Sequence, residues 1–129
     1  ILIINTNHRN YENKILINLK NYKISFICLA GYMKIISKKI LQNYGKKIIN
    51  IHPSLLPKFK GLDTFNRVLR AKEKFTGCTV HFVDEKLDNG KVIVKKRINI
   101  QKDFNQKILK NYVQIAEYNP LKRRKPKME

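Results

Sequence analysis

The feature that most constrains the fold is a short, continuous apolar run at residues 24–30, ISFICLA. A bilayer span needs about 20 apolar residues, so this run is too short to cross a membrane. Its β-branched bias is typical of a strand that is buried on both faces of a parallel sheet. Cys28, inside the run, is therefore expected to be a small buried hydrophobic residue. A second run, KIINI at residues 47–51, predicts a second buried strand.

Capping residues and apolar spacing predict the other elements. Alternation in the last strand indicates that it lies near a sheet edge. Helices are expected at residues 11–19, 37–43, 64–72 and 105–117, with Ser37 and Thr64 as N-caps, and further strands at 77–83 and 91–100. This order predicts an α/β fold with an open, Rossmann-like sheet, mixed but mostly parallel, flanked by helices.

The chain carries a net charge of +19 over 129 residues, a value that suggests polyanion binding. The basic residues are spread along the chain, however, which favours an ordinary solvated surface; only residues 121–129, LKRRKPKME, form a basic tail. The sequence shows no stacking-aromatic or groove-reading motif, which argues against a nucleic-acid partner.

The chain has two cysteines, too few and too far apart for a disulfide framework or a metal-spacing motif. The start, ILIINTNHRN, has no signal-peptide pattern. We therefore expect a cytoplasmic protein without a metal ion or a membrane partner. Because the chain does not begin with Met, we also expect it to start inside a longer protein.

The candidate chemistry follows the strand at 47–51. Open α/β sheets bind ligands at the carboxyl ends of their parallel strands, where Asn50 and His52 stand two residues apart and should point to the same side. Asp88, in the turn LDNG, is a third candidate. Each has an ordinary structural explanation as well: a histidine at a strand end is usually a satisfied polar residue, and Asp-Asn-Gly is common turn chemistry.

Together, an amide, an imidazole and a carboxylate suit acyl transfer to an amine. The amide N–H and the charged imidazole can stabilise a developing oxyanion. The carboxylate can stabilise the imidazolium and accept the proton that the amine loses. No covalent nucleophile is needed, because the amine is one.

Three separated motifs then resemble the formyltransferase family, in particular the branch that acts on glycinamide ribonucleotide. They are LAGYMKIIS at residues 29–37, NIHPSLLPKFKGLDT at 50–64 and GCTVHFVDEKLDNG at 77–90. The motifs stand in the family's order, and together the resemblance covers roughly residues 24–100. It implies transfer of the formyl group of 10-formyltetrahydrofolate to the amino group of glycinamide ribonucleotide, in purine biosynthesis.

The resemblance also implies roles for individual residues. Asn50 would donate to the formyl oxygen, His52 would be the general acid and Asp88 the carboxylate that supports it. The folate pocket would be lined by Met33, Lys34, Ile35, Ile36 and Asn50, and Glu117 would contact the ribose of the substrate. Lys34 stands where the family usually has Arg, Asn89 where it has Gly, and Phe65 where it commonly has His.

Residues 1–120 would form the catalytic domain, without the glycine-rich phosphate-binding part with which family members begin, and 121–129 the tail. One side of strand 24–30 would then lack a neighbour, which predicts self-association. Two alternatives stay open: a fragment of a methionyl-tRNA-type formyltransferase, and an inactive, truncated or basic nucleic-acid-binding chain.

Overall fold

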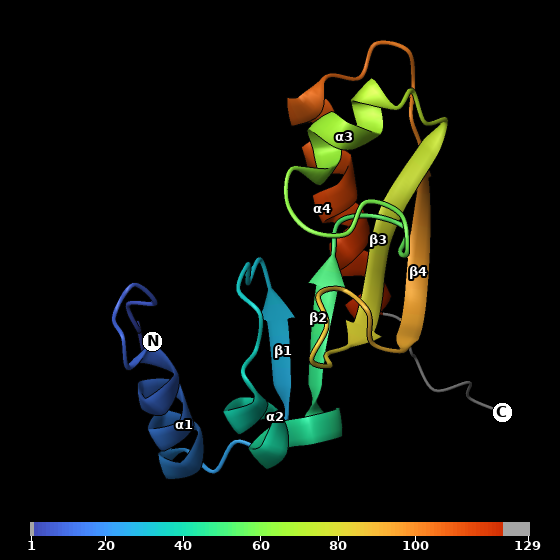
Figure 1. Cartoon of the computed structure of the whole chain (residues 1–129). Helices are drawn as coiled ribbons and strands as arrows, with labels where there is room; N and C mark the ends of the chain where they lie inside the picture. Colours follow the sequence, from blue (N-terminus) through green and yellow to red (C-terminus); the bar gives the residue numbers. More distant parts are fainter. Residues whose placement is uncertain (1, 123–129) are drawn as a thin grey trace, which may run out of the picture.

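The computed structural model describes residues 2–122, with side chains through Tyr118. It is a four-stranded sheet with helices packed against it (Figure 1). In chain order, the elements are α1 (Tyr11–Asn21), β1 (Ile27–Ala30), α2 (Lys38–Tyr44), the 3-10 turn η1 (Gly45–Lys47), β2 (Ile48–His52), α3 (Thr64–Arg70), β3 (Phe75–Phe82), β4 (Val92–Asn99) and α4 (Gln106–Lys122).

The sheet has the strand order β1-β2-β3-β4, with β1 parallel to β2 and the other two pairings antiparallel. The predicted mixed α/β sheet flanked by helices is thus confirmed, but the expectation that it is mostly parallel is wrong. Parallel neighbours need a crossover, which α2 provides between β1 and β2. By contrast, β4 follows β3 through a short connection that returns the chain in the opposite direction.

The expectation that the strand at 24–30 is buried on both faces is also wrong. β1 covers only Ile27–Ala30, its residues alternate between partly buried and exposed, and Cys28 is exposed. Phe26, just before it, is 48% exposed. The burial alternates because only one face of β1 packs: Ile27 and Leu29 lie against the first hydrophobic cluster, whereas Cys28 and Ala30 on the other face are exposed.

The helix ends follow the sequence closely. Ser37 is the extended N-cap of α2, and Gly45 ends that helix with a positive φ of 34°. The N-cap of α3 is Asp63 rather than Thr64, since the backbone of Thr64 is already helical and its side chain is only 3% exposed. α4 continues to Lys122, beyond the predicted end at residue 117.

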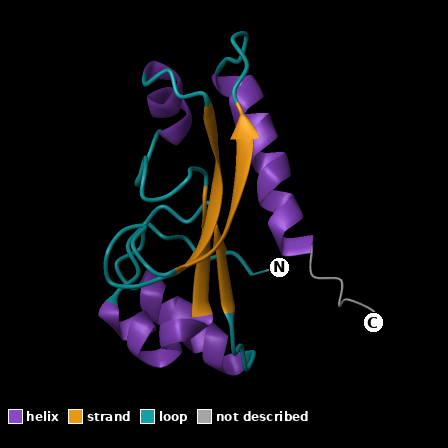
Figure 2. Cartoon of the chain, turned by 90° about the vertical axis from the view of Figure 1, so that its right-hand side faces the viewer, coloured by secondary structure: helices purple, strands orange, loops and turns teal. Residues whose placement is uncertain are grey.

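Two hydrophobic clusters stabilise the fold. The first joins α1, α2 and β2, and the second joins α3, α4 and β3; their buried members are Leu16, Ile36, Ile40, Tyr44 and Ile48 in the first, and Val68, Cys78, Leu109, Val113 and Ala116 in the second. Figure 2 shows α4 running along the β3–β4 pair. β2 contributes Ile48 to the first cluster and packs Ile51 against the second, so this strand connects the two halves, and its carboxyl end lies beside the second cluster.

The predicted division into a domain at residues 1–120 and a tail at 121–129 stays a prediction. The first residues of that tail belong to α4, and residues 123–129 lie outside the described part.

Candidate active site

The pairing of β2 with β3 sets the first part of the site. In this antiparallel register, Asn50 lies opposite His81 and His52 lies opposite Thr79. The side-chain nitrogen of Asn50 is 3.3 Å from Nε2 of His81. The other ring nitrogen, Nδ1, is 2.8 Å from the carbonyl oxygen of Phe82 and must carry a proton to donate to it. In the neutral ring, Nε2 is therefore the acceptor for the Asn50 amide.

His52 is held from both sides. It is 5% exposed, with Nε2 2.8 Å from the Phe59 carbonyl oxygen and Nδ1 3.4 Å from Oδ2 of Asp88. A carbonyl oxygen only accepts, so Nε2 donates to it. An imidazole donates from both of its nitrogens only when it is positively charged, and both nitrogens of His52 face oxygen acceptors. The Phe59 carbonyl and Asp88 are therefore placed to accept from the two ring nitrogens of His52.

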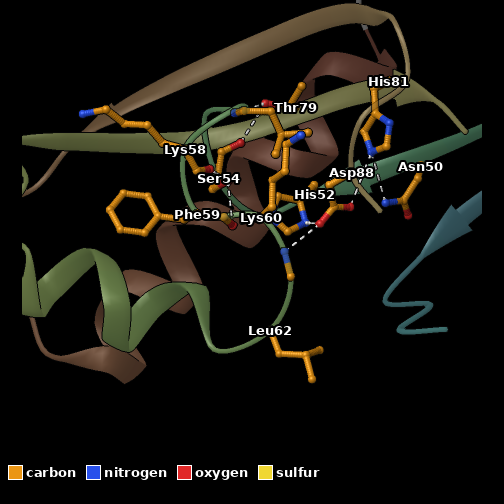
Figure 3. A network of polar contacts seen from close by, with 12 residues as sticks. Asn50, His52, Ser54, Lys58, Phe59, Lys60, Leu62, Thr79, His81 and Asp88 are labelled. Carbon is orange, nitrogen blue, oxygen red and sulfur yellow. Dashed lines mark hydrogen bonds and ion pairs between the residues drawn. The ribbon is translucent and has the colours of Figure 1, made fainter. Parts of the chain in front are cut away.

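Asp88 lies between the two histidines. Its Oδ2 accepts the N–H of Gly61 at 2.8 Å, and its Oδ1 is 3.8 Å from Nε2 of His81. Figure 3 shows Asn50, His52, His81 and Asp88 converging from β2, β3 and the turn after β3. Asp88 has a positive φ of 48°, a backbone region that Asp tolerates better than most residues.

The turn that carries Asp88 is fixed at its base. Gly90 lies so close to β3 that a Cβ atom there would be 1.7 Å from the carbonyl oxygen of Phe82. Beside Asp88, Asn89 accepts a hydrogen bond from Lys60 at 3.2 Å and donates to Asp84 at 3.3 Å. Asn89 is thus held by hydrogen bonds to two neighbouring segments.

A cavity of about 580 Å³ opens beside these groups, and Asn50, His52 and Asp88 all line it. α4 also lines the cavity with polar side chains, among them Lys110, Gln114 and Glu117. Burial raises the pKa of the Glu117 carboxyl above its ordinary value. The lining of the cavity therefore combines the amide, imidazole and carboxylate with polar side chains from α4.

A much smaller cavity, of about 40 Å³, adjoins the same groups, since Asn50 and Asp88 line both. The segment that links β1 to α2 forms part of the walls: Met33 lines the larger cavity, and Lys34, Ile35 and Ile36 line the smaller one. The Asn50 side-chain oxygen is buried without a hydrogen-bond partner in the described part of the chain. An unsatisfied buried acceptor at a cavity wall is suited to receive a ligand donor.

The structure thus brings together every residue that the sequence singled out, Glu117 included, around two adjoining cavities. Sequence reasoning missed His81, which is 2% exposed and contacts both Asn50 and Asp88. Its only signal was its place inside the motif GCTVHFV. The register that places it opposite Asn50 depends on long-range strand pairing, which cannot be read from the sequence alone.

Two negative findings hold for the described residues. No group of three or more His, Cys, Asp or Glu side chains is arranged to hold a metal ion. Along residues 2–122, no helix combines the length and the apolar character that crossing a membrane requires.

Fold and site together define an α/β protein with an amide, two imidazoles and a carboxylate at the end of its parallel strand pair. Comparison with known proteins gives the family: the formyl transferase model matches residues 5–124. The chain belongs to the formyl transferase family.

Individual relatives support this assignment. The chain is 41% identical over 116 residues to the phosphoribosylglycinamide formyltransferase of Bacillus subtilis (strain 168), covering 85% of this chain and 60% of that protein. It is 36% identical over 118 residues to the human trifunctional purine biosynthetic protein adenosine-3, covering 87% of this chain and 12% of that one.

Among solved structures, phosphoribosylglycinamide formyltransferase from Bacillus halodurans matches with a TM-score of 0.81 and 39% identity, over 84% of this chain and 56% of that one. The enzyme from Streptococcus pneumoniae matches with a TM-score of 0.83 and 34% identity, over 87% and 62%. The chain thus spans less than two thirds of the length of each of these relatives.

Proposed function

We propose that this chain transfers the formyl group of 10-formyltetrahydrofolate to the amino group of glycinamide ribonucleotide, as a step of purine biosynthesis in the cytoplasm. The observation that carries the proposal is the convergence of Asn50, His52 and Asp88 on one wall of a cavity. The names of the relatives, which are phosphoribosylglycinamide formyltransferases, favour this acceptor.

In the proposed reaction, the lone pair of the amine forms a bond to the formyl carbon, and the bond from that carbon to the folate nitrogen then breaks. The amide N–H of Asn50 and the charged ring of His52 stabilise the negative charge on the formyl oxygen. Asp88 takes the proton that the amine loses, and His52 gives one to the folate nitrogen as it leaves. The products are a formylated amine and tetrahydrofolate.

The contacts of His52 limit which of its two ring protons can be transferred. Its Nε2 proton is held by the carbonyl oxygen of Phe59, at 2.8 Å. The mobile proton is therefore the one on Nδ1, which faces the Asp88 carboxylate. A proton accepted by Asp88 can return along this contact to recharge the imidazole.

The folate pocket is proposed for the region where the two cavities adjoin, lined by Met33 in the larger cavity, by Lys34, Ile35 and Ile36 in the smaller one and by Asn50 in both. The unpartnered Asn50 oxygen can accept a hydrogen bond from the polar ring system of the folate. Met33 and Ile35, which are 66% and 60% exposed, supply apolar surface for the same ring system. Glu117, across the larger cavity, is proposed as a contact to the ribonucleotide.

The test measures the absorbance change as 10-formyltetrahydrofolate loses its formyl group, with glycinamide ribonucleotide as the acceptor. Asp88→Asn keeps the size of the side chain but removes its charge, and we expect turnover to fall by about 10²- to 10⁴-fold. The control is Asp103→Asn, the same chemical change at an exposed residue before α4. Wild-type turnover in Asp88→Asn would contradict the mechanism.

A competition between glycinamide ribonucleotide and methionyl-tRNA separates the proposed acceptor from the alternative one. The net charge of +19 is the feature that suits a tRNA. Formylation of the tRNA in preference to the ribonucleotide would contradict the proposed acceptor and favour the methionyl-tRNA-type alternative.

We also propose that the isolated chain self-associates through β1. The outer edge of β1 has no strand partner in the described part of the chain, and Ile24 and Phe26 next to it are 41% and 48% exposed. By contrast, the outer strand at the other end, β4, carries the adjacent cations Lys96 and Arg97, and charged side chains protect sheet edges from association.

A further inference from the structure

The loop between β2 and α3 supplies the backbone groups that hold the His52–Asp88 pair. The Phe59 carbonyl accepts from Nε2 of His52 at 2.8 Å. Two residues on, the N–H of Gly61 donates to Oδ2 of Asp88, also at 2.8 Å. The relative placement of the imidazole and the carboxylate therefore depends on the path of the backbone from Phe59 to Gly61 (Figure 3).

The backbone conformation of this loop is not the one that its residues prefer by themselves. Phe59, Gly61 and Asp63 have positive φ values of 56°, 82° and 55°. Only the glycine adopts that region without cost, so two of the three residues are held against their preference. Such a conformation persists where surrounding groups determine it.

Arg67, one turn into α3, is the side chain that holds this path. Its Nη1 donates to the carbonyl oxygens of Lys60, at 2.6 Å, and Leu62, at 3.0 Å, the two residues that flank Gly61. Its guanidinium carbon also lies 5.6 Å from the centre of the Phe59 ring. The guanidinium of Arg67 thus contacts the loop on both sides of Gly61, whose N–H donates to Asp88. It also contacts Phe59, whose carbonyl accepts from His52.

We propose that Arg67 is a positioning residue for the catalytic pair: its contacts are with Phe59, Lys60 and Leu62 rather than with His52 or Asp88, and through them it fixes the two backbone groups that orient the pair. The inference deepens the proposed function and rests on it for its effect on turnover. The flat guanidinium can both donate to the carbonyls and lie over the ring. A lysine keeps the charge but loses the planar shape, so it should replace Arg67 only in part.

The test compares Arg67→Gln with Arg70→Gln, the same change at an exposed arginine on the same helix. We measure the hydrogen exchange of the Gly61 amide and the NMR signal of the His52 Nε2 proton. In Arg67→Gln, we expect faster exchange of both protons and an unchanged far-UV spectrum, whereas Arg70→Gln should match the wild type. Wild-type protection of both protons in Arg67→Gln would overturn the inference.

Turnover gives the second readout. A displaced catalytic pair should lower kcat by about tenfold to a hundredfold in Arg67→Gln, with KM for the donor unchanged, and Arg67→Lys should recover part of the loss. If Arg67→Gln does not fold, Phe59→Leu removes the ring contact and keeps the carbonyl, and it should show the same changes to a smaller degree. A folded Phe59→Leu with wild-type exchange and kcat would also count against the inference.

Because the exchange measurements need no substrate, the two proposals can fail separately. A chain without turnover, in which Arg67→Gln still exposes the Gly61 amide and the His52 proton, would contradict the proposed function and retain the positioning role of Arg67. An active wild-type chain, in which Arg67→Gln leaves the exchange of both protons unchanged, would retain the proposed function and contradict the positioning role of Arg67.

Discussion

Nδ1 of His52 lies 3.4 Å from Oδ2 of Asp88, and the two side chains are only 6% and 7% exposed. A carboxylate so far from solvent is stable only while its hydrogen-bond partners remain. The pair is therefore a structural element of the protein as well as the proposed source of its acid–base chemistry.

Asp88→Ala should destabilise the fold, because it leaves the Gly61 N–H and the His52 ring without their acceptor. Leaving buried donors unsatisfied costs about 1–3 kcal/mol, so we expect a loss of this size in the free energy of unfolding, measured with urea. Asp103→Ala, at an exposed position, should leave the midpoint within experimental scatter. Equal midpoints for the two variants would show that the pair contributes nothing to stability.

Gly90→Ala should disturb the turn that carries Asp88. The added Cβ would meet backbone, the carbonyl oxygen of Phe82, at 1.7 Å. Since backbone cannot rotate away as a side chain can, we expect a loss of about 1–3 kcal/mol and a loss of turnover. Urea unfolding and the formyl-transfer assay check both effects, with Lys91→Ala, at the exposed next residue, as the control. A fully active and stable Gly90→Ala would contradict the close approach.

Glu117 should make stability depend on pH. Burial raises the pKa of its carboxyl in the folded state above the ordinary value of 4.5, so the folded chain binds this proton more tightly than the unfolded chain does. Stability therefore rises as the pH falls from neutral through the folded-state pKa, and it levels off below the unfolded value. Glu117→Gln removes the buried charge and should raise the urea midpoint at pH 7.

The gain in Glu117→Gln should shrink as the pH approaches 4. Glu85→Gln, at an exposed position, serves as the control, and a gain in Glu117→Gln that is the same at pH 4 and pH 7 would refute the assignment. Glu117→Gln should also raise KM for the ribonucleotide if Glu117 contacts this substrate.

Placing a charge at the outer edge of β1 should prevent self-association. We expect the wild-type chain to elute from gel filtration as an oligomer at micromolar concentration, and Phe26→Lys to shift it toward the monomer, because a buried charge opposes edge pairing. Ile115→Lys, which adds the same charge at an exposed apolar residue of α4, is the control and should elute as the wild type does. A wild-type chain that is monomeric at this concentration would disprove the proposal.

The sequence predicted the local features of this protein well. Helix and strand positions followed from apolar spacing and from residues such as Ser37 and Gly45, which act within one turn of the chain. Asn50 and His52 could be placed on one face because they belong to one strand. Asp88 could be assigned to the site only through the family resemblance. No local rule connects the turn at Asp88 to β2, which ends 36 positions earlier at His52.

The features that the sequence did not predict all depend on long-range pairing. His81 became part of the site only through the register of β3 on β2, and the burial expected for Cys28 required packing on both faces of β1, of which only the face of Ile27 and Leu29 is packed. Likewise, the role of Arg67 depends on the carbonyls of a loop whose backbone angles are unusual for its residues.

The division of the interior into two clusters has a consequence for cooperativity. His52 ends the strand that connects the clusters, and Asp88 stands in the turn that follows β3, which packs in the second cluster. Their contact forms only while β2 and β3 are paired, so a partial opening that separates these two strands would break the proposed catalytic pair before the chain unfolds globally. Catalytic competence should therefore vanish at a lower denaturant concentration than helical structure does.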